Sequence, residues 1–355
     1  MKLLYLGAHS ILEYYELSVF AELGIDFFCL GSYVDPKKPV DKIRPPLNVN
    51  GNKRWMDMKS TIEKNRTVGD PKFHGIDMRD NIPKEFIDEF DVIYVMHVPR
   101  WVKHNWDKFS RKIVIWRTIG QSNTEIEMFM QEFRQKGVKI IRYSPKERTI
   151  PGYAGEDVVI RFPIDKNEFS GWTGEEKNVL TICQSIKGRA EACNFFAYEK
   201  STKGLPRKLF GRSNEDVEYS GGEISFERMK EEMKKCGVYF CTNTKPASYT
   251  LNFCEALMTG IPVVALGDSW GNSFSTIGAD SLYEIPSIFQ SEEKISGDIC
   301  GITNDNLFVL NGQIRTLLEN KSVADTISKN GRRLAIKLFD KDMIKQQFKE
   351  FFNTL

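Results

Sequence analysis

The stretch Ser248-Tyr-Thr-Leu-Asn-Phe-Cys-Glu255-Ala-Leu-Met-Thr-Gly260-Ile-Pro262-Val-Val-Ala-Leu, residues 248–266, decides the fold of this chain. Its middle predicts a short helix that carries Glu255 and ends at Gly260. Pro262 follows soon after, which is the usual punctuation of a helix C-terminus. Residues 262–266 are apolar on both faces, as is typical of a strand buried in a parallel sheet. We therefore expect a helix followed by a parallel strand.

The turn before this helix, together with Glu255, could hold a ribose diol and a diphosphate. The carboxylate of Glu255 could accept hydrogen bonds from two ribose hydroxyls, while N–H groups at the helix N-terminus face a diphosphate. The candidate donor-binding residues of the turn are Ser248, Tyr249, Thr250 and Leu251. An ordinary helix start capped by Ser248 or Thr250 is the alternative, and both roles can hold at once.

The length of 355 residues exceeds what one hydrophobic core usually supports, so two domains are expected. No apolar run approaches the roughly 20 residues of a membrane span, and the N-terminus enters a strand directly without a signal peptide. The seven scattered cysteines suit reduced, buried thiols. No Cys/His spacing resembles a zinc site, so no metal is expected. These features predict a cytoplasmic protein.

Short apolar runs alternate with amphipathic stretches, which predicts parallel, doubly wound α/β sheets. We expect domains at 1–165 and 170–335, with a helix at 336–355 that returns to the first domain. The expected strands are residues 2–6, 26–30, 92–96, 112–116, 138–142, 179–183, 207–210, 238–241, 262–266 and 282–285. The expected helices are residues 11–23, 125–136, 190–200, 226–235, 253–258 and 323–352, the last with a break near 339–342.

Two cations follow the strand at 179–183, in Gln184-Ser-Ile-Lys187-Gly-Arg189. At the carboxyl end of a strand, Lys187 and Arg189 could offset the negative charge of a diphosphate leaving group, so that no metal is needed. Two surface cations on an ordinary turn are the alternative.

Polar side chains also follow strands of the first domain. His97 ends one predicted strand, Arg117 and Gln121 follow the next, and His9 follows the first. In a two-domain α/β protein, ligands bind outside the carboxyl ends of the strands, so these residues could line a cleft. Each of them alone is more often structural.

Other motifs exclude common sites. No G-x-G-x-x-G or G-x-x-x-x-G-K-[ST] fingerprint is present, which argues against ordinary dinucleotide and ATPase sites. Asp340 and Asp342 have the spacing of a metal-binding acid pair, but they begin a predicted helix and an N-cap is expected there.

The run Glu255-Ala-Leu-Met-Thr-Gly-Ile-Pro-Val-Val-Ala resembles the nucleotide-sugar signature of GT-B glycosyltransferases related to glycogen and sucrose synthases. The resemblance implies two Rossmann-like domains that face a cleft, with Glu255 on the ribose of the nucleotide. The resemblance extends to two further segments. Residues 91–99 resemble the strand of the family's first domain that ends in His, here His97, and residues 331–355 resemble its closing helices. Residues 210–212 and Asn243 lie where the resemblance places the base.

This sequence departs from that family pattern in three places, one being the absence of a histidine expected near Thr118 or Ile119. Ala247 stands where the family has an earlier acid, which leaves a retaining outcome open. Gln184 occupies one of the two cation positions after the first strand of the second domain, and Arg189 the other, with Lys187 as a stand-in.

A looser resemblance is to phage DNA glucosyltransferases, through Lys187-Gly-Arg-Ala-Glu-Ala-Cys-Asn-Phe-Phe and Thr250-Leu-Asn-Phe-Cys-Glu. Residues 36–72 hold ten basic and four acidic residues around Trp55. Such a loop could meet the phosphates of DNA, although a solvated loop is the alternative.

We therefore expect a glycosyltransferase that uses a nucleoside-diphosphate sugar, UDP-sugar first, as co-substrate and no other cofactor. His97, Arg117 and Gln121 would serve as catalytic or acceptor-side residues. The first expectation for the acceptor is a hydroxymethylated pyrimidine in DNA, and a cell-envelope glycan or glycolipid is the alternative. An epimerase-like or nucleotide-sugar-binding protein is the rival from another class. A monomer or homodimer without membrane insertion is expected.

Overall fold

The computed structural model describes residues 1–31, 44–45, 47, 51–68, 77–272 and 282–355. The chain forms two compact units. The first unit comprises Met1–Pro145, Gly152–Ile160 and Lys345–Leu355, and the second comprises Lys146–Pro151 and Arg161–Ile344. Within the described residues, no helix is both long and apolar enough to cross a membrane.

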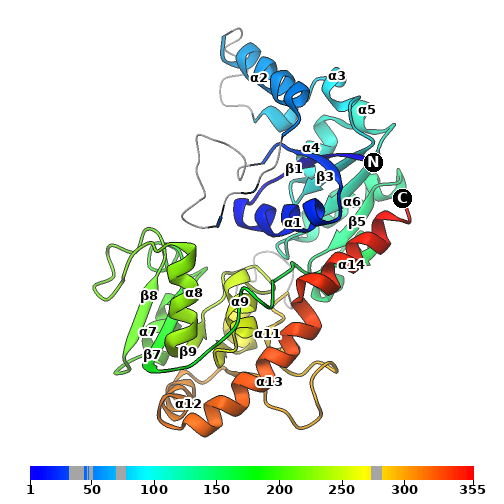
Figure 1. The fold of residues 1–355 in the computed structure, drawn as a ribbon. Helices are drawn as coiled ribbons and strands as arrows, with labels where there is room; N and C mark the ends of the chain where they lie inside the picture. Colours follow the sequence, from blue (N-terminus) through cyan, green and yellow to red (C-terminus); the bar gives the residue numbers. More distant parts are fainter. Residues whose placement is uncertain (32–43, 46, 48–50, 69–76, 273–281) are drawn as a thin grey trace. The chain divides into compact units, whose positions relative to one another are not determined.

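The first unit is built on a six-stranded parallel sheet with the order β2-β1-β3-β4-β5-β6 (Figure 1). Its strands are β1 (Lys2–Leu6), β2 (Asp26–Cys29), β3 (Val92–Met96), β4 (Ile113–Arg117), β5 (Lys139–Arg142) and β6 (Val158–Val159). Its helices are α1 (Ser10–Glu22), α2 (Lys53–Val68), α3 (Lys84–Ile87), α4 (Pro99–His104), α5 (Trp106–Phe109) and α6 (Thr124–Gln135). The strand order reverses between β1 and β3, where ligands bind in such sheets.

The second unit repeats this architecture with a five-stranded parallel sheet of order β11-β10-β9-β7-β8. Its strands are β7 (Glu176–Ile182), β8 (Arg207–Phe210), β9 (Cys236–Cys241), β10 (Val263–Leu266) and β11 (Ile302–Asn304). Its helices are α7 (Phe195–Ser201), α8 (Phe226–Lys235), α9 (Leu251–Thr259), α10 (Asp268–Gly271), α11 (Ile285–Phe289), α12 (Leu307–Glu319) and α13 (Lys321–Phe339). Here the order reverses between β7 and β9.

The decisive stretch folds as its sequence predicts. Thr250 caps α9, Gly260 ends it with φ +94°, and β10 follows as a fully buried strand. Only glycine adopts that left-handed backbone without strain, which explains why the helix ends there. The predicted fold class, two parallel α/β sheets, is confirmed by both units.

Nine of the ten predicted strands are present, and the prediction for 282–285 is wrong. Those residues lead into α11, whose first turn contains Pro286, a residue suited to a helix start and unsuited to a central strand. The fifth strand is β11 instead. Residues 190–194 form turns, so the helix predicted from 190 begins only at Phe195.

The predicted basic loop is partly a helix. Residues 53–68 form α2, while 36–43, 46, 48–50 and 69–72 lie outside the described residues. Trp55 is only 1% exposed, and its ring packs against Phe28 and Phe90 in the core of the first unit. It is therefore a core residue and has no free face for a nucleic-acid base.

The last helix, α14 (Lys341–Phe352), belongs mainly to the first unit. Its Phe348 and Phe352 pack edge-on against Phe20 of α1, with ring centroids 5.2 and 5.4 Å apart. The predicted break falls at Asp340, whose carboxylate accepts a hydrogen bond from Lys166 Nζ at 2.6 Å. Helices α13 and α14 are thus separated at Asp340, and the chain passes just after it from the second unit to the first.

Candidate functional site

The connections that follow β7, β8 and β9 are tied together at the carboxyl edge of the second sheet. Asn214 Nδ2 donates to the carbonyls of Cys183 (2.7 Å) and Gly211 (3.0 Å), and its Oδ1 accepts from Ile186 N at 2.8 Å. Asn194 Nδ2 donates to the carbonyl of Thr242 at 2.8 Å. The rim at the reversal point is therefore organised in advance of any ligand. Sequence reasoning missed both asparagines, although Gly211-Arg-Ser-Asn214 directly after a predicted strand is a turn signal.

Backbone strain concentrates at the same edges of the sheets. Among the described residues, five non-glycine residues have positive φ, and all five lie in connections that follow a strand: His97, Ser185, Asn194, Ser213 and Asn243. Such conformations cost free energy and persist where the surrounding structure enforces them, often at binding sites. These residues thus gather at the carboxyl edge of each sheet, the edge at which ligands bind in such folds.

Helix α9 begins at this rim. The Oγ1 of its N-cap, Thr250, accepts a hydrogen bond from Phe253 N at 3.4 Å. Capping uses one of the first N–H groups, and those at Leu251 and Asn252 have no partner within the helix. A helix N-terminus with such groups and its dipole favours an anion.

Two buried polar atoms beside the α9 N-terminus have no hydrogen-bond partner among the described residues. They are Asn243 Oδ1 and Ser248 Oγ, from side chains that are 2% and 0% exposed. Asn243 uses its Nδ2 to bond the carbonyl of Ala247 at 2.9 Å, which fixes the orientation of the amide. Buried polar groups are nearly always paired, so these two atoms are candidates for hydrogen bonds to a bound group.

Glu255 lies one turn into α9 and is fully buried. Its carboxylate accepts a hydrogen bond from Asn252 Nδ2 at 3.0 Å. The acid expected to hold a ribose is therefore close to the helix start, with an amide of the same helix beside it.

Tyr249 has a structural partner. Its hydroxyl accepts from Arg161 Nη1 at 3.0 Å, and Arg161 also pairs with Glu284. The ring packs against Phe339 of α13. Tyr249 thus anchors the turn to its own unit, and its hydroxyl is already engaged.

The two cations predicted to meet the diphosphate are both exposed. Lys187 Nζ lies 3.5 Å from Asp216 Oδ2, and Arg189 Nε donates to the carbonyl of Gln184 at 3.2 Å. Lys245, by contrast, is only 7% exposed, and burial lowers its pKa below the usual value. The connections after β7 and β9 therefore carry two exposed cations and one buried lysine.

In the first unit, His97 follows β3 at the reversal point, with φ +63°. Its backbone is held by Arg117 O and Trp116 Nε1, at 2.8 and 3.1 Å. Its Nδ1 is buried without a partner among the described residues. Burial, and then the charge of His9, lower the pKa of His97 to about 4. A neutral imidazole at this edge can exchange hydrogen bonds with a hydroxyl at neutral pH.

The structure places the other two first-unit candidates differently. Arg117 is fully buried, where its Nε lies 2.6 Å from Glu16 Oε1 and its Nη1 donates to the carbonyl of Arg142 at 2.8 Å. Its side chain therefore lies inside the unit. Gln121 is half-buried in the connection after β4.

One cluster of potential metal ligands exists among the described residues: Glu176, Glu232 and Cys236, with ligand atoms within 4.8 Å of one another. Lys208 Nζ already donates to both carboxylates, at 2.5 and 2.8 Å. The side-chain ammonium thus takes the place that a metal ion would need. All seven cysteines of the chain are buried thiols outside any disulfide bond.

The sequence matches no protein-family model, and no curated protein matches it. Solved structures do match in fold. Anabaena HepE in complex with UDP-glucose has a TM-score of 0.65 at 14% identity over 100% of both chains. A glycosyltransferase from Rickettsia africae has a TM-score of 0.61 at 12% identity over 99% of this chain and 98% of its own.

A third match is an alpha-glucosyltransferase solved with UDP-glucose and DNA containing an abasic site. It has a TM-score of 0.59 at 10% identity, over 100% of this chain and 99% of its own. At these identities the likeness concerns the fold. The chain has the GT-B fold that these glycosyltransferases share, which confirms the predicted fold class.

Proposed function

We propose that this protein transfers a sugar from a nucleoside-diphosphate donor, UDP-sugar, to an acceptor hydroxyl. The observation that carries the proposal is the rim around the α9 N-terminus, with the buried, unpartnered Asn243 Oδ1 and Ser248 Oγ beside it. Such a site suits an anion that also presents hydroxyl or N–H groups. The GT-B fold of the chain supports this function.

In the proposed complex, the N–H groups near Thr250 and Leu251 bind the diphosphate and Glu255 holds the ribose. The residues at 210–212, with Asn243, meet the base. In the reaction the bond between the sugar C1 and the phosphate oxygen breaks, and UDP leaves with the electron pair. The acceptor oxygen forms the new bond to C1 and gives up its proton. Lys187 and Arg189 are exposed, so each can turn toward the leaving diphosphate and offset its charge.

His97 and Gln121 would serve the acceptor side. A neutral His97 can orient a hydroxyl, and the buried Arg117 would act as a positioning residue because its carbonyl holds the backbone of His97. The seven cysteines, none in a disulfide bond, fit a reducing compartment, so we place the protein in the cytoplasm.

For the acceptor we propose a hydroxymethylated pyrimidine in DNA. The support is a full-length structural match that was solved with UDP-glucose and DNA, together with the looser sequence resemblance around Lys187 and Thr250. A cell-envelope glycan or glycolipid is the alternative that the experiment separates.

The test is to incubate the protein with radiolabelled UDP-sugars and one of three acceptors: hydroxymethylated DNA, unmodified DNA or a lipid-linked glycan. Label transferred to hydroxymethylated DNA alone supports the full proposal. Label on the glycan retains sugar transfer but overturns the DNA acceptor. UDP-sugar that is bound and never consumed contradicts transfer altogether.

The donor site is tested separately by calorimetry. Glu255→Gln should weaken UDP-sugar binding at least about tenfold, because hydrogen bonds to a charged group contribute roughly 1.5–3 kcal/mol. Glu319→Gln, on the exposed end of α12, is the matched control and should bind as wild type. Asn243→Ala is a second variant in case Glu255→Gln does not fold. Unchanged affinity in both variants contradicts this site.

A further inference from the structure

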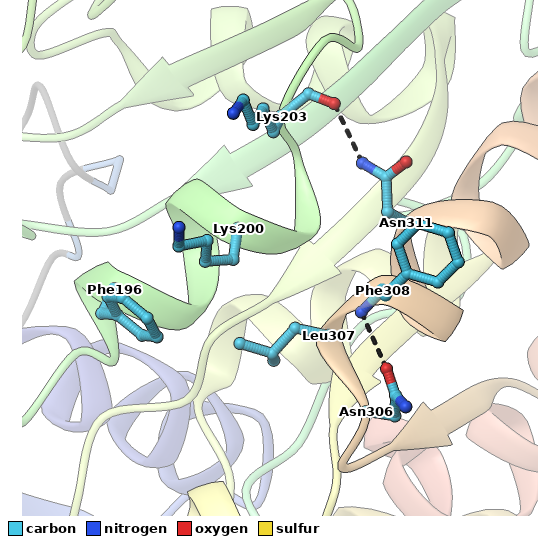
Figure 2. A pocket seen from close by; sticks show the side chains of 7 residues that line it. All are labelled: Phe196, Lys200, Lys203, Asn306, Leu307, Phe308 and Asn311. Carbon is cyan, nitrogen blue, oxygen red and sulfur yellow. Dashed lines mark hydrogen bonds between the residues drawn. The ribbon is translucent and has the colours of Figure 1, made fainter.

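A concave, basic and aromatic surface lies on the second unit, away from the α9 turn in sequence. Helices α7 and α12 border a hollow of about 580 Å³ (Figure 2). Phe196 of α7 and Phe308 of α12 stand at opposite sides of it, with Leu307 between them. Phe196 is 60% exposed and Phe308 is 87% exposed, which is rare for large apolar side chains in one patch.

The charge of this hollow is positive. Lys200 and Lys203 line it, and neither has an ionic partner among the described residues. No carboxylate lines it. The two nearest acids in sequence are committed elsewhere: Asp305 accepts from Ser269 N at 2.9 Å, and Glu199 lies 3.3 Å from Arg207. An anionic occupant is therefore favoured.

The amides of the hollow are largely engaged in holding the helices. Asn306 Oδ1 accepts from Phe308 N and Val309 N, at 3.0 and 3.2 Å. Asn311 Nδ2 donates to the carbonyls of Ser201 and Lys203, both at 3.0 Å. Few hydrogen-bonding groups thus remain for the many hydroxyls of a neutral glycan. Ring faces and ammonium groups are what the surface offers.

The ring of Phe196 packs against a second aromatic ring that is itself held by a hydrogen bond. The ring of Trp270 in α10 stacks on Phe196, with centroids 6.2 Å apart and planes 30° apart, and its Nε1 donates to Asp305 O at 3.0 Å. Lys200 Nζ lies 5.4 Å from the centre of the Phe196 ring. A fixed ring beside an ammonium group matches the stacking of a base with its phosphate nearby. A bilayer surface would need a convex apolar tip, whereas this surface is hollow.

The fold puts the surface on the carboxyl edge of the second sheet. Phe196 and Phe308 are each the second residue of a helix that follows a strand, β7 and β11, so both lie at the carboxyl edge of the sheet. The α9 rim lies at the same edge, after β9. A strand that runs along this edge can therefore meet the hollow and approach the rim.

We propose that this hollow binds an unpaired stretch of a DNA strand, with bases on Phe196 and Phe308 and phosphates on Lys200 and Lys203. The choice of DNA rests on the proposed acceptor, whereas the contact itself is separate from the donor site. The surface would hold DNA on the enzyme while the target nucleotide is modified.

The test measures binding of a labelled single-stranded oligothymidylate to the full chain by fluorescence anisotropy. F196A/F308A should weaken binding at least about thirtyfold, since each of the two stacked bases contributes roughly 1–3 kcal/mol. An abasic strand of the same length should bind the wild type as weakly as it binds this variant. K200Q/K203Q should lower the slope of log K against log salt by about 1.4, because each phosphate contact on a single strand contributes about 0.7.

Ile299→Ala and Lys177→Gln, both exposed on the same unit, are the matched controls and should bind DNA as wild type. Unchanged DNA affinity in F196A/F308A overturns the proposal. So does equal or tighter binding of the abasic strand, of phosphatidylglycerol vesicles or of an acidic glycan. UDP-sugar binding is measured in parallel and should be wild type in every patch variant. If the wild-type protein bound no UDP-sugar, the proposed function would be refuted. The measured DNA affinity of the hollow would still stand.

Discussion

At the scale of single residues, Ser248 and Asn243 are the side chains on which the proposed donor site depends most directly. Each carries a buried polar atom that no described residue satisfies. Such an atom costs the folded state roughly 1–3 kcal/mol. The free energy is recovered only when a ligand supplies the missing partner, so affinity and stability should respond to these residues in opposite directions.

Ser248→Ala tests this opposition. Removing the unpaired hydroxyl should leave the free energy of unfolding unchanged or raise it by about 1 kcal/mol, while the Kd for UDP-sugar rises about tenfold. Urea unfolding and calorimetry measure the two quantities. The control is Ser225→Ala, which removes the satisfied N-cap of α8 and should cost about 1 kcal/mol with donor affinity intact. A loss of stability in Ser248→Ala with unchanged Kd would contradict the site.

His97 makes a second residue-level prediction, about pH. Its pKa falls to about 4 in the folded protein, against roughly 6.5 for a solvated histidine. Between these values the unfolded chain binds the proton more readily, so the histidine lowers stability as the pH falls through that window. The slope is at most about 1.4 kcal/mol per pH unit. Above pH 6.5 the effect is absent.

Denaturant unfolding at pH 7 and pH 5 measures this effect. His97→Gln should lose less stability than wild type between the two pH values, because glutamine takes up no proton. His104→Gln, an exposed residue beside Asp80, is the control and should not reduce the loss. If His97→Gln and wild type lose equally, burial does not govern the titration of His97.

At the scale of elements, the predictable part of the fold is the alternation of buried strands and helices. Apolar runs such as β3 and β10 have no exposed face, so their assignment depends on no distant contact. The β11 strand has three half-buried residues, too few for any pattern. The run 282–285 has three strand-favouring residues around Glu284, and it forms the approach to α11 instead.

The site was predictable to a similar extent. The sequence of α9 shows a capped helix with an acid one turn in, since capping and acid position are local properties. The partners of two other side chains are distant in sequence. Arg117 pairs with Glu16, 101 positions away, and Tyr249 bonds Arg161, 88 positions away. No local pattern reports such pairs, which is why the burial of both side chains was not anticipated.

The connection between β8 and α8 gives an element-level prediction. Asn214→Ala removes three buried hydrogen bonds that tie the loops after β7 and β8, and should cost roughly 2–4 kcal/mol of unfolding free energy. It should also weaken UDP-sugar binding, because the rim loses its preorganisation. Asn320→Ala, which removes the N-cap of α13, is the control and should cost about 1 kcal/mol with donor affinity unchanged. Equal donor affinity in both variants would separate the loop from the site.

At the scale of the whole molecule, the final helix, α14, belongs mainly to the first unit, although it follows the second unit in sequence. Phe348 of α14 is fully buried and packs on Phe20 of α1. Phe348→Ala should therefore cost about 3–5 kcal/mol and weaken the first unit. Hydrogen exchange should speed up in α1 more than in α9. The control is Phe308→Ala, an exposed phenylalanine, which should stay within about 0.5 kcal/mol.

The path of the chain between the two units limits how the protein can be divided. Lys345–Leu355 belongs to the first unit. Lys146–Pro151 belongs to the second unit, although the segments before and after it in sequence belong to the first. A gene cut near residue 160 would therefore yield an N-terminal piece with Phe20 uncovered. The C-terminal piece would carry the amphipathic helix α14 without its packing partner. A split-protein reporter, or expression of the N-terminal half alone, would need α14 supplied as a separate peptide.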